Sequence, residues 1–367
     1  MKVALVTDWL TNIGGAEKVL AAIAEVFPDA PIFTTVCDTS NIGDLAKKDI
    51  RCSFLQKIPV LHKKHQLLSA FLPQAIESLD LSHYDMIISF SSSVAKSVLT
   101  SPDQTHICYI HSPMRYAWEP FFDKRFEKFP RIFSPLISLI LHRLRIWDKA
   151  SAERPDKYIA NSSTTQKRVS QYYRKESEVL YPPVRMDKFS LSKKKKDYFL
   201  GLGRMVAYKR FDLIAEAFTK MPDKKLILAG SGPEFSRVEK IAKKSPNIIL
   251  LSELSDTEVV KLYSEAQGFI LPQKEDAGIV QLEAMASGTP VIAYKAGGAL
   301  DVIQDGENGV FFKEQTAESL CEGVRRCEKI SWDSKKIRES VKQYDVKEFQ
   351  RRFENIVKAK NRHAEQR

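Results

Sequence analysis

Residues 3–27, VALVTDWLTNIGGAEKVLAAIAEVF, hold a pattern from which the fold can be argued. The run from Val3 to Val6 is short and apolar, which is typical of a buried strand. Gly14 and Gly15 follow, and beyond them apolar residues recur at spacings of three and four, as on one face of a helix. A strand, a glycine turn and a helix in this order indicate an α/β domain with a parallel sheet. The two glycines also allow a ligand to approach the backbone closely.

The same alternation continues through the first half of the chain and then stops. It ends at Tyr181-Pro182-Pro183-Val184, because proline can neither continue a helix nor sit inside a central strand. Beyond this point it restarts, with a strand expected over 198–202 and a helix over 210–221. The other expected strands cover residues 31–35, 86–90, 106–110, 157–160, 225–229, 248–251, 268–271 and 290–293.

Two series of strands and helices predict two Rossmann-like domains, residues 1–184 and 185–345, with a terminal helix within 346–367. Open α/β sheets bind ligands at the carboxyl ends of their strands. With two such domains, the expected ligand site is the cleft between them.

Composition agrees with a two-domain globular chain. The 367 residues correspond to about two domains at roughly 150 residues each, and 43% apolar with 28% charged residues excludes global disorder. Five cysteines with no C-x-x-C pair argue against a disulfide scaffold or a zinc ribbon. The sequence has no signal-peptide pattern and no run of the roughly 20 apolar residues that a membrane span needs. We therefore expect a cytoplasmic protein.

The net charge of +11 is concentrated in part within residues 115–175, where Lys and Arg outnumber Asp and Glu by more than two to one. The same segment holds the run IFSPLISLILHRLRIW, residues 132–147. Basic residues beside an apolar face bind anionic lipid headgroups, so one interpretation is a membrane-contacting surface. The other is a helix whose apolar face is core and whose basic face is solvated. A nucleic-acid partner has only the charge to support it, and no nucleic-acid-binding module is recognisable.

The segment PQKEDAGIVQLEAMASGTPVIAY, residues 272–294, carries the most chemistry. Glu275 and Glu283 are separated by seven residues, and Gly278 precedes a predicted helix. A helix N-terminus after a glycine turn favours phosphate, because free N–H groups and the positive end of the helix dipole meet there. A carboxylate one turn into the helix can accept hydrogen bonds from a pair of hydroxyls. Solvated surface acids are the alternative, which the apolar or small neighbours AMASGTPVIA disfavour.

A second segment, GLGRMVAYKR at 201–210, places Arg204 and Lys209 directly after a predicted strand. Two fixed cations at a strand end suit a pyrophosphate. The alternative is two solvated basic residues before a helix. The full dinucleotide fingerprint fails because position 206 is Val.

A third segment, HSPMRYAWEP at 111–120, places His111 at the end of the predicted strand over 106–110. A single histidine there is more often structural than catalytic. Here it stands beside Ser112, Arg115, Tyr116 and Trp118, a mixture typical of sugar or acceptor recognition. No D-x-D and no H-E-x-x-H occurs in the chain, which disfavours metal-dependent phosphate chemistry.

Four segments in this order together resemble the retaining glycosyltransferases of family 4: GGAE at 14–17, GRMVAYK at 203–209, AGSGP at 229–233, and the paired glutamates. The resemblance implies the α/β GT-B fold, two Rossmann-like domains facing across a central cleft. HSPMRYAWEP is similar to the mannosyltransferase branch that assembles O-antigen and other surface polysaccharides, including lipopolysaccharide. The resemblance covers about residues 3–345 and further implies that the terminal helix crosses back to the N-terminal domain.

Roles for individual residues follow from the resemblance. Glu275 would contact the donor sugar and His111 would hydrogen-bond it near the reacting carbon, so these two are the catalytic candidates. No residue would bind a metal. Ser112, Arg115 and Tyr116 are the acceptor-side candidates because of their residue types, not because of the resemblance. Ala277 departs from the many family members that have an aromatic residue there. The donor-binding residues would be Gly14, Gly15, Arg204, Lys209, Gly230, Leu254, Ala277, Gly278, Ile279, Val280 and Glu283.

The expected activity is a retaining, metal-independent transfer of a hexose to a glycan or polyprenyl-linked acceptor. GDP-mannose is the favoured donor, a UDP-sugar is possible, and no cofactor is needed. Peripheral contact with the inner face of the cell membrane would suit a lipid-linked acceptor. Two alternatives stay open at this point: a nucleotide-sugar epimerase of the same fold, and a nucleotide-sugar-binding protein without enzymatic activity.

Overall fold

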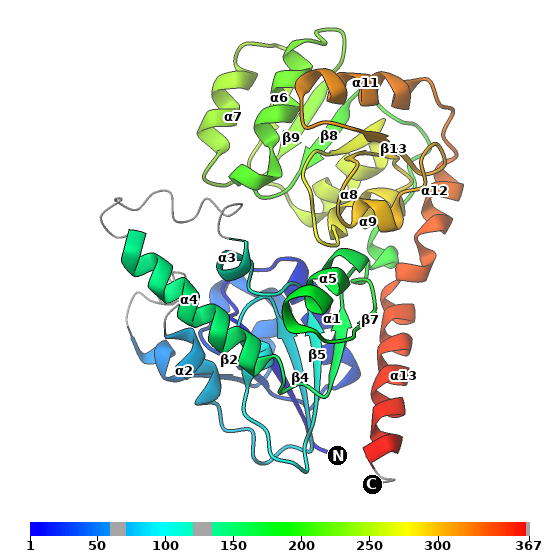
Figure 1. The fold of residues 1–367 in the computed structure, drawn as a ribbon. Helices are drawn as coiled ribbons and strands as arrows, with labels where there is room; N and C mark the ends of the chain where they lie inside the picture. The colour runs from blue at the N-terminus through cyan, green and yellow to red at the C-terminus, as the bar shows by residue number, and fades with distance from the viewer. Residues whose placement is uncertain (59–70, 120–133, 365–367) are drawn as a thin grey trace. The chain divides into compact units, whose positions relative to one another are not determined.

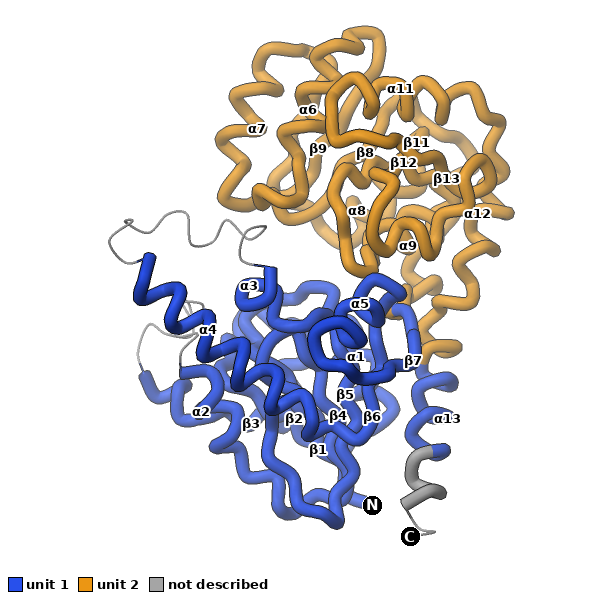
Figure 2. The backbone as a smooth tube through the Cα atoms, viewed as in Figure 1, with its two compact units in different colours: residues 1–181, 350–367 blue, residues 182–349 orange. Residues whose placement is uncertain are grey.

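A computed structural model describes residues 1–58, 71–119 and 134–364 (Figure 1). The chain divides into two compact units, which we describe separately (Figure 2). Unit 1 comprises residues 1–181 together with 350–367, and unit 2 comprises residues 182–349.

Unit 1 is built on a seven-stranded, fully parallel sheet of order β3-β2-β1-β4-β5-β6-β7. The chain adds strands on one side of β1 and then returns to add β4 on its other side. This reversal beside β1 is the topological switch point at which doubly wound sheets bind ligands. The strands are β1 (Val3–Thr7), β2 (Ile32–Thr34), β3 (Ile50–Cys52), β4 (Met86–Ser91), β5 (Thr105–Ile110), β6 (Lys157–Ala160) and β7 (Glu178–Val179).

Helices pack on this sheet through apolar side chains. The first, α1 (Gly15–Val26), starts at a capping box in which the Gly14 N–H donates to Glu17 Oε2 at 2.8 Å. Its Val19, Leu20 and Ile23 side chains are fully buried. The other helical segments are η1 (Thr39–Asn41), η2 (Gly43–Lys47), η3 (Phe54–Lys57), α2 (Leu72–Glu77), η5 (Ala95–Ser97), α3 (Arg115–Trp118), α4 (Ser134–Ser151), α5 (Ser163–Arg168) and η8 (Val169–Tyr173).

Unit 2 repeats the plan with a six-stranded parallel sheet of order β10-β9-β8-β11-β12-β13, whose switch point lies between β8 and β11. The strands are β8 (Phe199–Leu202), β9 (Leu226–Ala229), β10 (Ile248–Leu251), β11 (Gly268–Leu271), β12 (Val291–Tyr294) and β13 (Gly309–Phe312). The helical segments are η9 (Met186–Lys188), η10 (Ala207–Lys209), α6 (Phe211–Thr219), α7 (Phe235–Ala242), α8 (Asp256–Glu265), α9 (Ile279–Ala286), α10 (Ala299–Val302), α11 (Ala317–Glu328), α12 (Ser334–Ser340) and η11 (Lys342–Tyr344).

The predicted fold class, two parallel-sheet Rossmann-like domains, is confirmed. Their arrangement across a cleft stays a prediction. The last helix, α13 (Val346–Ala364), begins in unit 2, and its residues from Gln350 onward group with unit 1. There the Gln350 Nε2 donates to the Ala22 carbonyl of α1 at 2.8 Å and to Glu25 Oε2 at 3.0 Å.

None of the helices that the structure describes is long and apolar enough to cross a membrane. Within the basic segment 115–175, residues 120–133 lie outside the described part of the chain. The apolar run over 132–147 is therefore described from Ser134 onward, where it forms α4.

Candidate active site

Three of the predicted site residues of unit 2 lie at the carboxyl ends of its two central strands, β8 and β11. Arg204 and Lys209 lie in the loop after β8, and Glu275 follows β11. The two strands are parallel neighbours, so their carboxyl ends meet at the switch point. There Lys209 Nζ lies 3.6 Å from Glu275 Oε1, and each side chain is less than one-fifth exposed.

Of the two cations at these strand ends, Lys209 lies beside a carboxylate and Arg204, among the described residues, does not. Glu275 Oε1 also accepts a hydrogen bond from Gln273 Nε2 at 2.9 Å, which fixes the carboxylate. The Arg204 side chain is exposed, and its guanidinium makes no hydrogen bond or ion pair with any residue that the structure describes. One cation paired with a carboxylate and one unpaired cation leave net positive charge where an anionic ligand would sit.

A glycine turn after β9 holds the Arg204 loop in place. The Gly203 N–H donates to the Ala229 carbonyl at 3.0 Å, and the Met205 N–H donates to the Ser231 carbonyl at 2.8 Å. Gly230 has a φ of +132°, and a Cβ added there would lie 2.1 Å from the Gly203 oxygen. Only glycine permits this close approach. Gly230, which the resemblance placed at the donor, therefore also positions Arg204.

If the Arg204 loop binds the nucleotide-sugar donor that the sequence predicts, replacing Gly230 by Ala should raise the KM for that donor at least tenfold, because the new methyl group must push the Arg204 loop away from β9. Initial rates at varied donor concentration measure this. Gly43→Ala is the matched control, since Gly43 also has a positive φ, +55°, but the nearest atom to an added Cβ is 4.0 Å away. An unchanged donor KM in Gly230→Ala would show that the loop does not serve the donor.

A second glycine turn, after β12, holds the loop that carries Glu275. The Gly298 N–H donates to the Glu275 carbonyl at 2.9 Å, and a Cβ on Gly297 would lie 2.2 Å from the same oxygen. Gln281 Nε2 donates to the Ala277 carbonyl at 2.8 Å. Gln273, Gln281 and this glycine pair were missed by the sequence reasoning. The glycine pair follows a strand as Gly14 and Gly15 do, and that signal could have found it.

The N-terminus of α9 borders this loop. Gly278 has a φ of +75° and precedes the helix, so the first N–H groups, those of Ile279 and Val280, have no acceptor within the helix. One turn further, Glu283 is buried, and its Oε2 accepts a hydrogen bond from the Tyr263 hydroxyl at 3.1 Å. Burial raises the pKa of Tyr263 well above its ordinary value, so the phenol keeps its proton and donates. Leu254 lies after β10 at the same sheet edge.

In unit 1 the carboxyl edge of the sheet is also polar. Asp8 follows β1 and accepts backbone N–H bonds of 2.6–2.7 Å from Ser92, Val94 and Ala95, beyond the end of β4. Burial raises the pKa of Asp8 to about 6 although these bonds oppose the rise. Gly14 and Gly15 start α1 at this edge. Asp8 thus ties the two strands that flank the switch point.

His111 follows β5, and its backbone N–H donates to the Ser91 carbonyl at 2.8 Å. The imidazole packs edge-on against Tyr109, with ring centroids 5.1 Å apart. Burial lowers the pKa of His111 to about 4, so the ring is neutral at pH 7. Its Nε2 is buried and makes no hydrogen bond with any residue that the structure describes.

The three acceptor-side candidates differ in their surroundings. Ser112 is buried and donates to the Pro113 carbonyl at 2.9 Å, and the buried Tyr116 hydroxyl lies 3.0 Å from Ser93 Oγ. Arg115 is more exposed and lies 3.8 Å from Glu119 Oε2. Ser112 and Tyr116 are buried and bond inside the protein, so of the three only Arg115 has its polar group near the surface. Across the described residues, no group of three or more His, Cys, Asp or Glu is placed to hold a metal ion.

Two family models match nearly the whole chain. The model described as "Glycosyltransferase Family 4" matches residues 13–188, and the one described as "Glycosyl transferases group 1" matches residues 185–348. The chain belongs to the family 4 type of glycosyltransferase. The boundary between the two matches falls where this family 4 glycosyltransferase passes from unit 1 to unit 2.

Individual relatives are similar in sequence to only part of this family 4 glycosyltransferase. Sulfoquinovosyl transferase SQD2 of Arabidopsis thaliana is 31% identical over 134 residues, which is 35% of this chain and 26% of that relative. N-acetyl-alpha-D-glucosaminyl L-malate synthase of Bacillus anthracis is 35% identical over 107 residues, 28% of each chain. The chain thus spans little more than a quarter of these curated relatives.

The fold is similar over the whole length to solved structures of low sequence identity. The crystal structure of Anabaena HepE in complex with UDP has a TM-score of 0.74 at 18% identity and covers 98% of this chain and 100% of that one. At this identity the likeness bears on the fold alone.

Proposed function

We propose that the protein is a retaining, metal-independent hexosyltransferase that uses a nucleotide sugar and acts on a glycan or polyprenyl-linked acceptor. The observation that carries the proposal is the edge at the β8–β11 switch point, where Lys209 lies 3.6 Å from Glu275. The unpaired guanidinium of Arg204 and the N-terminus of α9 belong to the same edge.

These groups suit departure of a nucleoside diphosphate. Negative charge develops on the leaving diphosphate, and fixed cations with free helix N–H groups stabilise it without a metal. The anomeric carbon becomes cation-like, and the carboxylate of Glu275 favours that charge. Attack by the acceptor hydroxyl from the face that the diphosphate leaves retains the configuration. His111, the residue that we assign to the donor sugar, has a neutral ring at pH 7.

GDP-mannose is the donor that we propose first, since HSPMRYAWEP at 111–120 is similar to the mannosyltransferase branch. A UDP-sugar is the second candidate, because HepE, which has the same fold, was crystallised with UDP and with UDP-glucose. The nucleotide would lie over the carboxyl ends of β9 and β10, with Glu283 toward the ribose. This end of the sheet includes Gly230 and Leu254.

A donor panel tests the proposal. The purified protein is incubated with GDP-mannose, UDP-glucose or UDP-galactose and a bacterial lipid extract, and products are read by mass and by the anomeric configuration of the new linkage. We expect one donor to give a hexose-extended lipid-linked product with retained configuration. Glu275→Gln should lower the rate at least tenfold, because the carboxylate charge is lost while the size is kept.

Other outcomes of the panel contradict the proposal. Conversion of the donor into another nucleotide sugar without an acceptor would identify an epimerase. Donor binding without any product would leave a nucleotide-sugar-binding protein. An inverted linkage would exclude the retaining mechanism.

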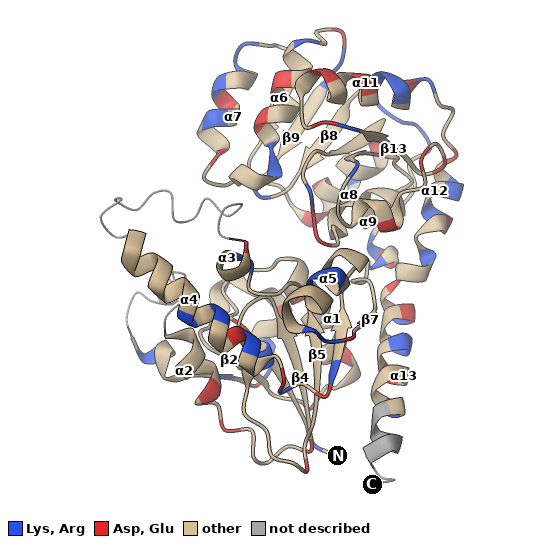
Figure 3. Ribbon diagram, in the orientation of Figure 1, with Lys and Arg blue, Asp and Glu red and all other residues tan. Residues whose placement is uncertain are grey.

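A lipid-linked acceptor would be reached by contact with a membrane surface through α4. Leu136, Leu139 and Ile146 of this helix are 47–58% exposed, and Arg143 beside them is also exposed. Figure 3 shows basic residues in the second half of the same helix. Exposed apolar side chains with basic neighbours suit a surface of anionic lipid.

The double variant Leu139→Ser with Ile146→Ser should weaken binding to phosphatidylglycerol vesicles at least threefold at low salt, because two inserting side chains are lost. Co-sedimentation with vesicles measures this. Ile249→Ser, which removes an apolar side chain of similar exposure (49%) from unit 2, serves as the control. If the wild-type protein ignores anionic vesicles at low salt, the membrane role is wrong.

A further inference from the structure

Unit 2 has a groove at the edge of its sheet opposite the candidate active site. One hollow of about 340 Å³ lies beside the turn 304–308, which directly precedes β13. A second, of about 370 Å³, is lined by Phe199, Gln267 and Pro290 at the amino ends of β8, β11 and β12. Trp332 lines both hollows, so they adjoin. Arg204 and Glu275 follow the carboxyl ends of the strands, at the other edge.

Trp332 is held rigidly between the two hollows. Its Nε1 donates to the Cys327 carbonyl at 2.8 Å, and part of the ring packs on the core of unit 2. The indole N–H is thus already bonded inside the protein, while the ring borders the groove. A fixed aromatic ring loses little conformational entropy when a ligand packs on it.

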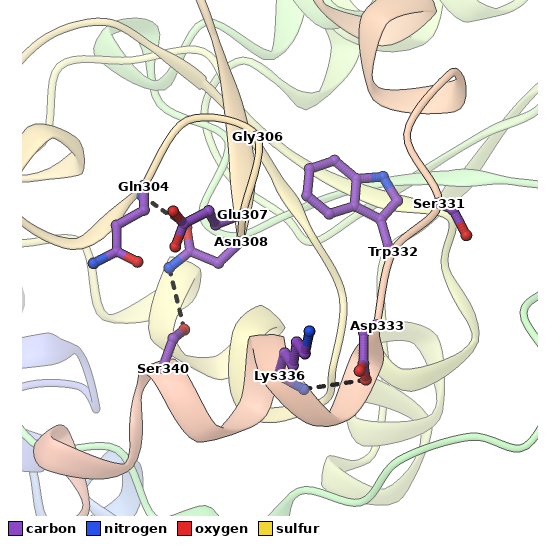
Figure 4. A pocket seen from close by; sticks show the side chains of 9 residues that line it. All are labelled: Gln304, Gly306, Glu307, Asn308, Ser331, Trp332, Asp333, Lys336 and Ser340. Atoms are coloured by element: carbon purple, nitrogen blue, oxygen red, sulfur yellow. Dashed lines mark hydrogen bonds between the residues drawn. The ribbon is translucent and has the colours of Figure 1, made fainter.

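The opposite wall of the first hollow is also fixed. Asn308 Oδ1 accepts the Gln304 N–H at 2.8 Å, and Asn308 Nδ2 donates to Ser340 Oγ at 3.1 Å, which ties the turn to α12. Figure 4 shows Trp332 on one side of the hollow, Gln304 and Glu307 on the other, and Lys336 with Ser340 on the helix beside them.

Several polar groups around this hollow have no partner in the part of the chain that the structure describes. Within the described residues, the Gln304 amide, the Glu307 carboxylate and the Lys336 ammonium make no hydrogen bond or ion pair, and all three residues are exposed. Hydrogen bonds could be accepted by the Gln304 amide oxygen and the Glu307 carboxylate, and donated by the Gln304 amide nitrogen and the Lys336 ammonium. An aromatic ring facing such a set suits a neutral polyhydroxylated ligand, whose C–H face packs on the ring and whose hydroxyls bond to the rim.

We propose that this groove binds a carbohydrate chain at a site separate from the candidate active site. A phosphorylated ligand is disfavoured, because Glu307 and Asp333 both line the first hollow against the single ammonium of Lys336. Two adjoining hollows beside one tryptophan give room for more than one sugar residue. Binding here does not depend on the proposed transfer reaction.

Affinity electrophoresis of the full chain tests the proposal. The protein is run in native gels that contain yeast mannan, dextran or glycogen, and its mobility is compared with that in a gel without polysaccharide. We expect at least one polysaccharide to slow the wild-type protein. Trp332→Ala should weaken that retardation at least fivefold, and Glu307→Ala, which removes an exposed side chain without disturbing the core, should weaken it at least twofold.

Two control variants separate this groove from the rest of the protein surface and from the candidate active site. Phe54→Ala removes an exposed aromatic side chain of unit 1 and should leave the retardation unchanged. Lys209→Ala alters the candidate active site and should also leave it unchanged, so a failed transfer assay and a failed binding assay are told apart. Thermal unfolding checks that each variant is folded.

The proposal is overturned if no polysaccharide slows the wild-type protein, or if folded Trp332→Ala and Glu307→Ala variants are slowed as the wild type is. Loss of retardation in Lys209→Ala would place the carbohydrate at the candidate active site and would overturn it as well. If the groove binds a peptide and no carbohydrate, none of the polysaccharides will slow the wild-type protein.

Discussion

Replacing Lys209 by Ala should lower kcat/KM for sugar transfer by about 100- to 1,000-fold, the usual effect of removing one group that stabilises developing negative charge. This corresponds to about 2.7–4 kcal/mol of transition-state stabilisation. Lys209 is the cation that lies beside Glu275, and its side chain is only 16% exposed, so solvent screens its charge weakly. Initial rates at varied donor concentration, with the donor that the panel identifies, give the value.

Lys240→Ala is the matched control for this loss. Lys240 is an exposed lysine of α7 in the same unit, so the same charge is removed from the protein but not from the β8–β11 edge. Its kcat/KM should stay within twofold of the wild-type value. If the kcat/KM of Lys209→Ala stays within threefold of the wild-type value, Lys209 does not bind the diphosphate.

A double-mutant cycle separates two roles for Lys209. If Lys209 acts mainly by holding Glu275, then adding Lys209→Ala to Glu275→Gln should cause little further loss, because contacting residues are non-additive. If it binds the diphosphate directly, the two losses should largely add.

The cluster of Arg204, Lys209 and Glu275 in unit 2 could be predicted from the sequence, because each of these residues follows a recognisable strand. Arg204 and Glu275 come within four residues of the ends of apolar runs, and neighbouring parallel strands place such positions close together. Gly230 and the glycine pair at 297–298 follow predicted strands, but their contacts could not be predicted. Gly230 meets the Arg204 loop, and Gly298 bonds to Glu275, only because of the strand order of the folded sheet.

In unit 1 the surroundings of the predicted residues could not be predicted. Ser112 and Tyr116 are acceptor-side candidates because of their residue types, and the Tyr116 hydroxyl lies 3.0 Å from Ser93 Oγ, 23 residues earlier in the chain. Local sequence does not reveal such a contact, because it depends on where η5 and α3 pack. The same limit concealed the polar cluster beneath α4, whose members come from four distant segments.

That cluster centres on an ion pair between Lys96 and Asp148. Lys96 Nζ lies 2.7 Å from Asp148 Oδ1, and both side chains are fully buried. Asp148 Oδ2 accepts hydrogen bonds from Trp118 Nε1 at 2.6 Å and from the Tyr173 hydroxyl at 2.8 Å. The Lys96 ammonium also lies 5.2 Å from the centroid of the Tyr173 ring. The cluster thus joins η5, α3, α4 and η8, so it fixes the segment that follows His111.

Replacing Asp148 by Ala should destabilise unit 1 by about 3–5 kcal/mol, because it leaves the Lys96 charge buried without a counter-charge and two donors without an acceptor. Urea unfolding followed by circular dichroism measures the change. Glu339→Ala, which breaks the exposed ion pair with Lys342, is the control and should leave the urea midpoint unchanged. In the double variant Lys96→Met with Asp148→Ala, the buried charge is gone, so part of the lost stability should return. If the double variant is less stable than Asp148→Ala alone, the cost does not arise from the uncompensated ammonium.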